Sequence, residues 1–282
     1  MTLDPSTLGH KAQTREFEYD WKTVALYALG IGAKRDELDY LYEGRGPKVY
    51  PTFAVVPPYP VVAELLEKCG GNLDMMVHGS QRIRLFRPIP PGGTLVTEGE
   101  IAGFYDLKRL AQVTFLTRSS FEGEPCFETE WSIIFRGEGG FGGKPPPKPP
   151  VGKIPSDLKP AWSIEATSTP EQALLYRLSG DLNPLHADPE FAARVGFDQG
   201  PILHGLCTFG YLGRAVVRGA CGGDPGRLEE LGGQFRRPVW PGDTIRTTGY
   251  DLDDGLTAIQ AHAADRTDPV MTNCWAKLRP VS

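Results

Sequence analysis

Alternation of hydrophobic and polar positions dominates this chain, and such alternation is typical of β-strands with one buried face. Two groups of three runs show it, and the first run of each group follows a Pro-Gly turn. The pattern therefore predicts two units built on antiparallel strands. The expected strands are residues 94–104, 109–120 and 125–135 in the first unit, and 244–252, 256–263 and 270–279 in the second.

Helical signals are fewer than strand signals. Asp20 can cap a helix from Trp21 to about Leu29, and residues 61–69 form a second helix that ends at Gly70-Gly71. Thr169-Pro170-Glu171-Gln172 reads as a capping box, which predicts a helix over 170–178. A fourth helix follows Gly205, because apolar residues recur there at helical spacing. These residues are Leu206, Phe209, Leu212 and Val216.

An internal repeat relates the two units. Residues 87–95 read RPIPPGGTL and residues 237–245 read RPVWPGDTI, an offset of 150, and each copy leads into an alternating run. Such a match indicates duplication. Arg87 and Arg237 are expected to fix the turns before the repeated strands and not to bind a phosphate. Residues 137–160 are rich in Gly and Pro and predict an extended linker.

These features predict an α+β fold in three parts. Residues 1–136 form a first half, 137–160 the linker and 161–282 a second half. In each half an antiparallel sheet packs around a helix, and the two sheets lie side by side as a pseudo-dimer.

Composition excludes several classes of protein. The net charge is −5 and no basic block occurs, which argues against nucleic-acid binding. No apolar run reaches 18 residues, so no membrane span is predicted. The five cysteines are odd in number and widely spaced, which argues against a disulfide framework or a zinc site. Since the first residues do not resemble a signal peptide, a cytoplasmic location is expected.

The candidate chemistry is concentrated in residues 179–186, SGDLNPLH. Asp181, Asn183 and His186 bring a carboxylate, an amide and an imidazole within a few positions. His204 and Gly205 then open an apolar helix. An acid/base pair beside a helix N-terminus suits the addition or removal of water next to a carbonyl.

The run YRLSGDLNPLH, followed by PILHGLCTFG, closely resembles the hydratase 2 motif of MaoC-like (R)-specific enoyl-CoA hydratases. The nearest likeness is to the two-halved hydratase 2 domain of peroxisomal multifunctional enzymes, which the FGGK run at 141–144 extends. The resemblance implies a double hot-dog fold. It also implies reversible hydration of trans-2-enoyl-CoA to (3R)-3-hydroxyacyl-CoA by a homodimer.

The resemblance also implies roles for single residues. Asp181, Asn183 and His186 match the catalytic acid, amide and imidazole, and Gly205 matches the backbone N–H that binds the thioester oxygen. The substrate-binding positions are His78, Gly79, Lys108 and Phe235. The first half lacks the D-x-N-P-x-H run and is expected to house a medium or long acyl tail. This chemistry requires no metal or redox cofactor, so none is expected, and coenzyme A enters as part of the substrate.

Other interpretations remain open from the residues. Asp181 and His186 are expected to hold one water together, and either could take its proton. Asn183 could orient that water or fix the loop, and Asp-x-Asn-Pro alone is usually a turn. His204 could be structural or functional, and Tyr176 is expected to be a packing residue. Alternative functions are an acyl-CoA thioesterase and a non-catalytic acyl-CoA binding protein.

Overall fold

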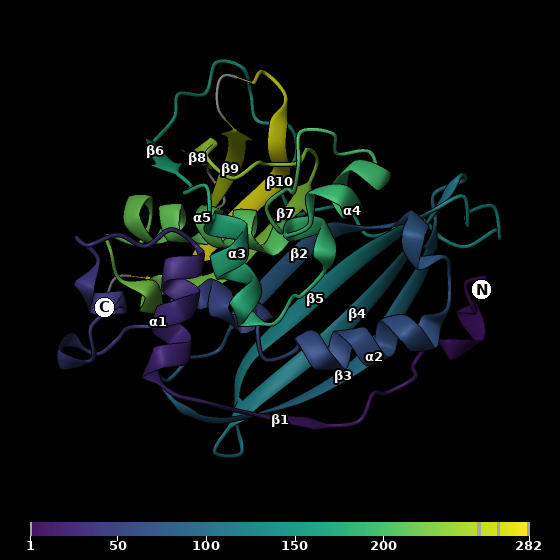
Figure 1. Ribbon diagram of the computed structural model, residues 1–282, viewed down its shortest axis with the longest axis horizontal. Coiled ribbons are helices and arrows are strands. Elements are labelled where there is room, and N and C mark those ends of the chain that lie inside the picture. The colour runs from purple at the N-terminus through teal and green to yellow at the C-terminus, as the bar shows by residue number, and fades with distance from the viewer. Residues whose placement is uncertain (1, 253–254, 264–265, 281–282) are drawn as a thin grey trace.

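One continuous antiparallel sheet of ten strands forms the frame of the molecule (Figure 1). The computed structural model describes residues 2–252, 255–263 and 266–280. The strand order is β1-β3-β4-β5-β2-β7-β10-β9-β8-β6, so the two halves meet edge to edge at β2 and β7. The strands of the first half are β1 (Arg15–Tyr19), β2 (Met76–Leu85), β3 (Gly93–Asp106), β4 (Leu110–Phe121) and β5 (Glu124–Arg136). Those of the second half are β6 (Trp162–Thr167), β7 (Leu228–Phe235), β8 (Thr244–Asp251), β9 (Leu256–Ala263) and β10 (Pro269–Leu278).

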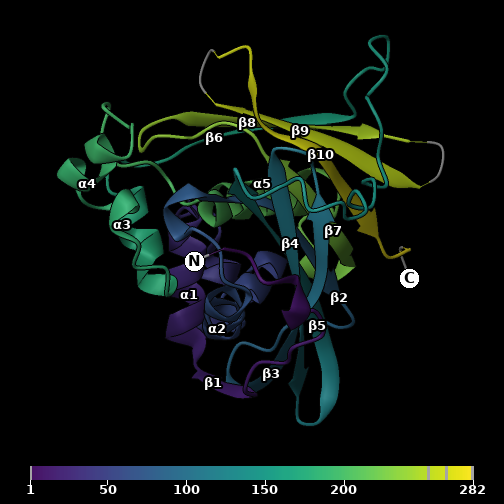
Figure 2. The same ribbon diagram turned by 90° about the vertical axis from the view of Figure 1, so that its right-hand side faces the viewer.

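The helices lie on one side of the curved sheet (Figure 2). They are α1 (Trp21–Gly30), α2 (Tyr59–Cys69), α3 (Gln172–Tyr176), α4 (Pro189–Arg194) and α5 (Gly205–Gly219). Short 3₁₀ turns occupy Pro5–Thr7, Leu38–Tyr40, Glu43–Arg45, Pro51–Val55, Leu73–Met75, Arg177–Ser179, Pro184–His186 and Pro225–Arg227. Within the described residues, no helix is long and apolar enough to cross a membrane. A single large core, which includes Phe53, Phe115 and Phe209, joins both halves.

The register of the central strand pair follows the sequence repeat. Arg82 pairs with Gly232 and Ser80 pairs with Gln234 in antiparallel β2 and β7. Arg82 and Gly232 differ by 150 positions, the same offset as the repeated turns. A pseudo-twofold axis that relates the two halves therefore passes through the Arg82–Gly232 pair, called the pairing centre below, as in a symmetric dimer. The double hot-dog fold is confirmed, with the two sheets merged into one.

The halves differ in their central helices. The repeat offset relates Gly205, the first residue of α5, to Val55, which lies in a 3₁₀ turn. Helix α2 begins only at Tyr59, about one turn later, after Pro57 and Pro58. Proline has no backbone N–H and disfavours a helical residue before it, which accounts for the late start.

The six predicted strands are confirmed to within a few residues, and so are three of the four helices. The predicted helix at 170–178 is divided in the structure, since α3 begins at Gln172 and continues from Arg177 as a 3₁₀ turn. Gln172 accepts from the Thr169 N–H at 3.3 Å, as a capping box requires. The amide nitrogen of Gln172 donates to the carbonyls of Leu29 and Gly30, and these two bonds tie α3 to α1.

The linker residues 137–160 form no helix or strand. Val151 is buried within this segment and packs with Ala258 and Trp275 in a small cluster separate from the main core. The linker is thus anchored on the second half by a few apolar contacts.

Candidate active site

Two consecutive turns shape the loop that carries Asp181 and His186. The Asp181 carboxylate accepts from the Asn183 N–H at 3.1 Å, and the Asn183 side chain accepts from the Leu185 N–H at 3.0 Å. Asn183 therefore caps the 3₁₀ turn Pro184–His186, in which Pro184 takes the first position. This contact matches the loop-fixing role considered for Asn183. Its participation in catalysis stays a prediction.

His186 is buried and held in one orientation. Its Nδ1 lies 2.8 Å from the Ile202 carbonyl oxygen, which can only accept. Nδ1 therefore carries the proton, and Nε2 presents a lone pair. Burial lowers the pKa of His186, although the Ile202 bond and the nearby Asp181 charge oppose the shift. The imidazole is therefore neutral near pH 7 and able to accept a proton.

His204 completes the cluster at the N-cap of α5. Its Nε2 lies 3.1 Å from the Asp181 backbone carbonyl, and its ring stacks on His186 with centroids 3.7 Å apart. The Tyr176 ring also packs against the His204 ring, with centroids 4.9 Å apart, as expected for a packing residue. The His204 Nδ1 is buried without a partner among the described residues. Burial and the adjacent His186 both lower the pKa of His204.

The polar atoms of these three residues converge. One carboxylate oxygen of Asp181 and one ring nitrogen each of His186 and His204 lie within 4.8 Å of one another. A water molecule at their centre can hydrogen-bond to several of them. The same donor set suits a transition-metal ion, because each imidazole has its other nitrogen fixed by a backbone carbonyl. That no metal takes part in the reaction stays a prediction.

A backbone donor adjoins this cluster. Gly205 is the first residue of α5, where N–H groups have no partner within the helix and the helix dipole is positive. A Cβ at Gly205 would meet the Phe235 ring at 3.4 Å, so the two residues face each other. Gly205 therefore offers an N–H beside an aromatic wall.

The first half supplies the rest of that wall. His78 on β2 stacks on Trp131 at 5.4 Å and packs against Phe235 at 4.8 Å. Burial lowers the pKa of His78 to about 4, while its Nε2 bonds to the Ser80 carbonyl. Gly79 lies at a break in the register between β2 and β5, and a Cβ there would collide with Ile134. The structure thus brings His78 and Gly79 to the Phe235 side of the site.

Lys108 is placed differently from the other predicted residues. It is exposed in the turn between β3 and β4, where its φ of 69° is left-handed. Its N–H donates to Asp106. Strand β5 separates β4 from β2, the strand that carries His78, so Lys108 does not lie on a strand adjacent to His78. Its contact with substrate stays a prediction.

Two first-half residues of the site were missed from the sequence. Tyr59, at the start of α2, interacts with the Asp181 side chain, and burial together with that carboxylate raises the pKa of its phenol. Trp131 on β5 stacks on His78 and lies 6.4 Å from the Tyr59 ring. Neither belongs to a motif, and no local signal marks them.

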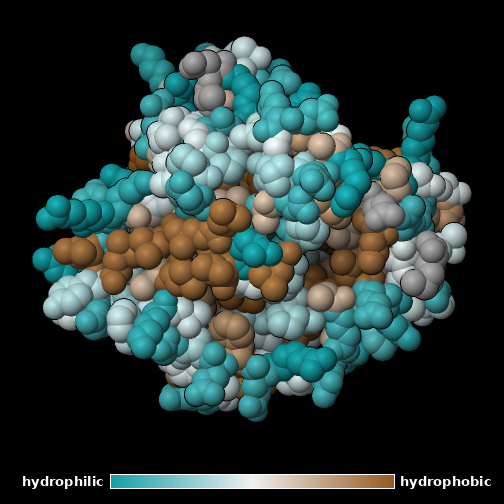
Figure 3. Space-filling view, viewed as in Figure 1, coloured by the Kyte–Doolittle hydropathy of each residue, from teal (hydrophilic) through white to brown (hydrophobic). Residues whose placement is uncertain are grey.

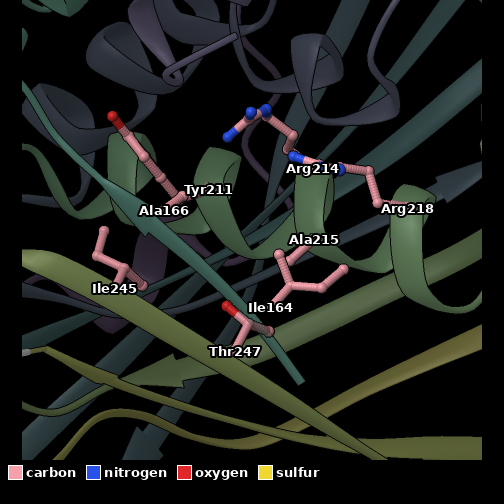
Figure 4. Close-up of a pocket in the computed structure, with 8 residues that line it drawn as sticks. All are labelled: Ile164, Ala166, Tyr211, Arg214, Ala215, Arg218, Ile245 and Thr247. Carbon is pink, nitrogen blue, oxygen red and sulfur yellow. The ribbon is translucent and has the colours of Figure 1, made fainter. Parts of the chain in front are cut away.

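A narrow pocket elsewhere is not part of this site. It lies between α5 and strands β6 and β8, and it is too tight to admit water (Figure 4). Figure 4 shows Arg214 reaching from α5 toward the N-terminal segments. There Arg214 forms a buried ion pair with Glu37, with Nε 2.8 Å from Oε1.

Family models, related sequences and solved structures all identify hydratase 2 or MaoC-like proteins as similar to this chain. Residues 17–137 match the MFE-2 hydratase 2 N-terminal domain, and residues 155–270 match the MaoC-like domain. A Dictyostelium discoideum protein named probable enoyl-CoA hydratase 2 is 35% identical, over 100% of this chain and 98% of its own. An Arabidopsis thaliana protein named enoyl-CoA hydratase 2, peroxisomal, is 38% identical over 85% of this chain and 84% of its own. The crystal structure of a MaoC-like dehydratase from Phytophthora capsici superposes with a TM-score of 0.89, at 29% identity, over 99% of this chain and 98% of that one.

Proposed function

Since this chain belongs to the family of MaoC-like enoyl-CoA hydratases 2, we propose that it reversibly hydrates trans-2-enoyl-CoA to (3R)-3-hydroxyacyl-CoA. One observation of the site supports this most directly. The Asp181 carboxylate and the His186 imidazole converge to within 4.8 Å at the N-terminal end of a 15-residue helix. A hydro-lyase needs this combination of a water-binding acid/base pair and a donor for the thioester oxygen.

The first step is the attack of water on C3. His186 Nε2 accepts a proton from the water, because Nδ1 already donates to Ile202. The Asp181 carboxylate accepts the second hydrogen bond of the same water and so fixes the face from which it adds. As the O–C3 bond forms, the π electrons of the C2–C3 double bond move toward the thioester carbonyl. The proton held by the Asp181/His186 pair then passes to C2.

The thioester oxygen carries negative charge between these two events. The Gly205 N–H at the start of α5 is positioned to donate to it, and the helix dipole reinforces this donor. Loss of one such donor typically costs about 3–4 kcal/mol of barrier. The Phe235 ring, which packs against His78, lies beside the residue that carries this donor.

Medium or long acyl chains are the proposed substrates. Helix α2 begins about one turn later than α5 does, so the end of a 3₁₀ turn and two prolines stand in the first half where the second half has the first turn of its α-helix. Tyr59, at the start of α2, also interacts with Asp181, which brings this region next to the reacting carbon. An acyl tail that leaves the site toward the first half would therefore enter the space beside α2.

A homodimer is the proposed assembly. Four large apolar side chains on or next to α1 and α3 are between 37% and 60% exposed. They are Trp21 and Leu29 on α1, Leu174 on α3 and Leu178 just after α3. Figure 3 shows hydrophobic surface over this part of the molecule. A second copy of the chain would remove that apolar surface from water. Light scattering should report a dimer for the native chain and a monomer for the double variant Leu174→Glu/Leu178→Glu.

The proposed location is the cytoplasm, and the state of the cysteines supports it. All five are free and buried in the described structure, which fits a reducing compartment. A relative is named peroxisomal, and cell fractionation of the native host would distinguish the two compartments.

The decisive assay combines the purified protein, trans-2-enoyl-CoA of several lengths and an (R)-specific 3-hydroxyacyl-CoA dehydrogenase that consumes the product. Turnover is expected, and Asp181→Asn or His186→Ala should lower it at least about 10³-fold. Unchanged turnover in both variants would contradict the assignment. Release of free coenzyme A thiol, without product for the dehydrogenase, would favour a thioesterase instead.

A further inference from the structure

The pseudo-twofold axis predicts where a second active site would lie if the halves were identical. The pairing centre at Arg82 and Gly232 relates Phe235, next to the active site, to Leu85 at the other end of β2. It likewise relates His78 to Leu228. A pocket of about 240 Å³ opens at that opposite end, and both Leu85 and Leu228 line it. This pocket, called the mirror pocket below, lies across the pseudo-twofold axis from the Phe235 side of the active site.

The mirror pocket has lost the catalytic groups. The repeat offset places Ala54 at the position of His204 and Val55 at the position of Gly205. Ala54 has no polar side-chain atom, and Val55 lies in a 3₁₀ turn and not at the start of a long helix. Among the described residues, those that line the mirror pocket include no histidine and no first residue of an α-helix. The mirror pocket can bind a ligand but lacks the means to hydrate it.

The floor of the mirror pocket is apolar. The buried side chains that line it are Pro47, Val49, Pro51, Leu85, Ile89 and Leu228. Such a lining favours a hydrocarbon group over water. The floor thus retains the character that an acyl chain requires.

Two arginines, Arg87 and Arg279, lie in the walls of the mirror pocket. The Arg279 guanidinium donates to the Gly226 and Leu228 carbonyls, and the Arg87 guanidinium to the Phe121 carbonyl. Among the described residues neither arginine forms an ion pair with a carboxylate. At the exposed rim, Lys48 lies 3.2 Å from Asp39, and Asp224 is the acidic residue lining the pocket. Two half-buried cations beside an apolar floor are complementary to an anion with a hydrocarbon body.

We propose that the mirror pocket binds a second, non-reacting acyl ligand, with its hydrocarbon chain on the apolar floor and its acidic head near Arg87 and Arg279. The head can be the carboxylate of a free fatty acid or the phosphates of an acyl-CoA. The two sources share this chemistry, and the experiment below separates them. The site is distinct from the Asp181/His186 centre, so its occupation does not depend on hydratase activity.

Calorimetric titration of the full chain tests the proposal with two saturated probes, decanoate and decanoyl-CoA, neither of which can be hydrated. Decanoyl-CoA should bind in two equivalents if the mirror pocket takes acyl-CoA. If it takes free fatty acid, decanoate should bind there in one equivalent and decanoyl-CoA only at the active site. Ile89→Trp, which fills the floor, should remove the mirror-pocket equivalent and leave the other.

The charge of the rim gives a second test with little risk to folding, because Lys48 is exposed. Lys48→Glu should weaken the mirror-pocket equivalent about fivefold, whereas Lys153→Glu in the linker should leave it unchanged. The proposal is overturned if neither probe binds beyond the active site. It is equally overturned if a second equivalent binds with the same affinity to both the Ile89→Trp and Lys48→Glu proteins. If Ile89→Trp fails to fold in a thermal melt, Lys48→Glu alone decides.

Discussion

The imidazole rings of His186 and His204 lie stacked, with centroids 3.7 Å apart and planes inclined by 28°. Both rings are buried, so two positive charges would repel each other in a medium of low dielectric constant. Each ring also has one nitrogen committed to a backbone carbonyl. The pair is therefore neutral near pH 7, with one lone pair on each ring.

The pH dependence of turnover follows from this pair. Because the pKa of His186 is lowered by burial, its neutral, proton-accepting form persists below the ordinary histidine value of about 6.5. We expect kcat/KM to be constant from pH 8 down to about 6.5 and to fall only in more acidic solution. Initial rates in buffers of constant ionic strength measure the profile. A midpoint of the acidic limb at pH 7 or above would mean that the pKa of His186 is raised and not lowered, and a rate that rises in acid would mean that protonated His186 is the active form.

The donor at the start of α5 can be removed without losing the helix. His204, the residue before Gly205, has φ −57° and ψ 140°, which a following proline allows, and proline is favoured as the first helical residue. Gly205→Pro should lower kcat by about 10²–10³-fold, because only the N–H is lost. Gly205→Ala keeps the N–H, and its Cβ makes an ordinary contact with Phe235 at 3.4 Å.

Steady-state kinetics of these two variants should therefore diverge. Gly205→Ala is expected to retain at least about a tenth of the native kcat. An equal loss in both variants would assign the effect to crowding against Phe235. Thermal melts of both proteins control for unfolding.

A buried ion pair joins the two halves, since Glu37 comes from the first and Arg214 from the second. The Tyr50 hydroxyl also donates to Glu37, at 2.6 Å. Arg214→Met should lower the free energy of unfolding by about 3–5 kcal/mol, because it leaves a buried carboxylate without its partner. The double variant Arg214→Met/Glu37→Gln should recover part of that loss. Urea titrations measure both, and equal destabilisation of the single and double variants would show that the unpaired Glu37 carboxylate is not the cause of the loss.

Acid sensitivity of the fold should depend on His78. Its pKa is lowered to about 4 in the folded protein and is about 6.5 in the unfolded chain. The unfolded state therefore binds more protons, and stability is lost as the pH falls from 6.5 through 4. His78→Phe keeps an aromatic ring against Trp131 and Phe235 and should remove up to about 3 kcal/mol of that loss. Identical pH dependence of unfolding in the two proteins would contradict this assignment.

The sequence predicts three strands of each half, but it misses the edge strands β1 and β6 and the central pair β2 and β7. Strands β3, β4, β8 and β9 alternate cleanly, whereas β2 and β7 contain Gly79, Gly232 and Gly233 and escaped prediction. Those glycines are explained only by tertiary contacts. A Cβ at Gly232 would collide with the Trp275 indole at 2.2 Å, for example. The local sequence pattern does not show such a requirement, because the side chain that leaves room only for glycine lies more than forty residues away in the sequence.

The candidate site divides in the same way. Asp181, His186 and Gly205 lie within one stretch of the second half, so the motif could predict them together. Tyr59 and Trp131 reach the site from the first half, and only the fold brings them there. The repeat predicted two related halves, but the pairing of β2 with β7, which gives the mirror pocket its place, required the structure.

The continuous sheet has a consequence for the covalent connection between the halves. Hydrogen bonds between β2 and β7 hold the halves together, while residues 137–160 contribute no strand or helix to the frame. Proteolytic cleavage within the linker would therefore leave a non-covalent heterodimer with an intact sheet. The two halves, produced as separate polypeptides, are then fragments able to reconstitute one enzyme, each shielding the exposed strand edge of the other from aggregation.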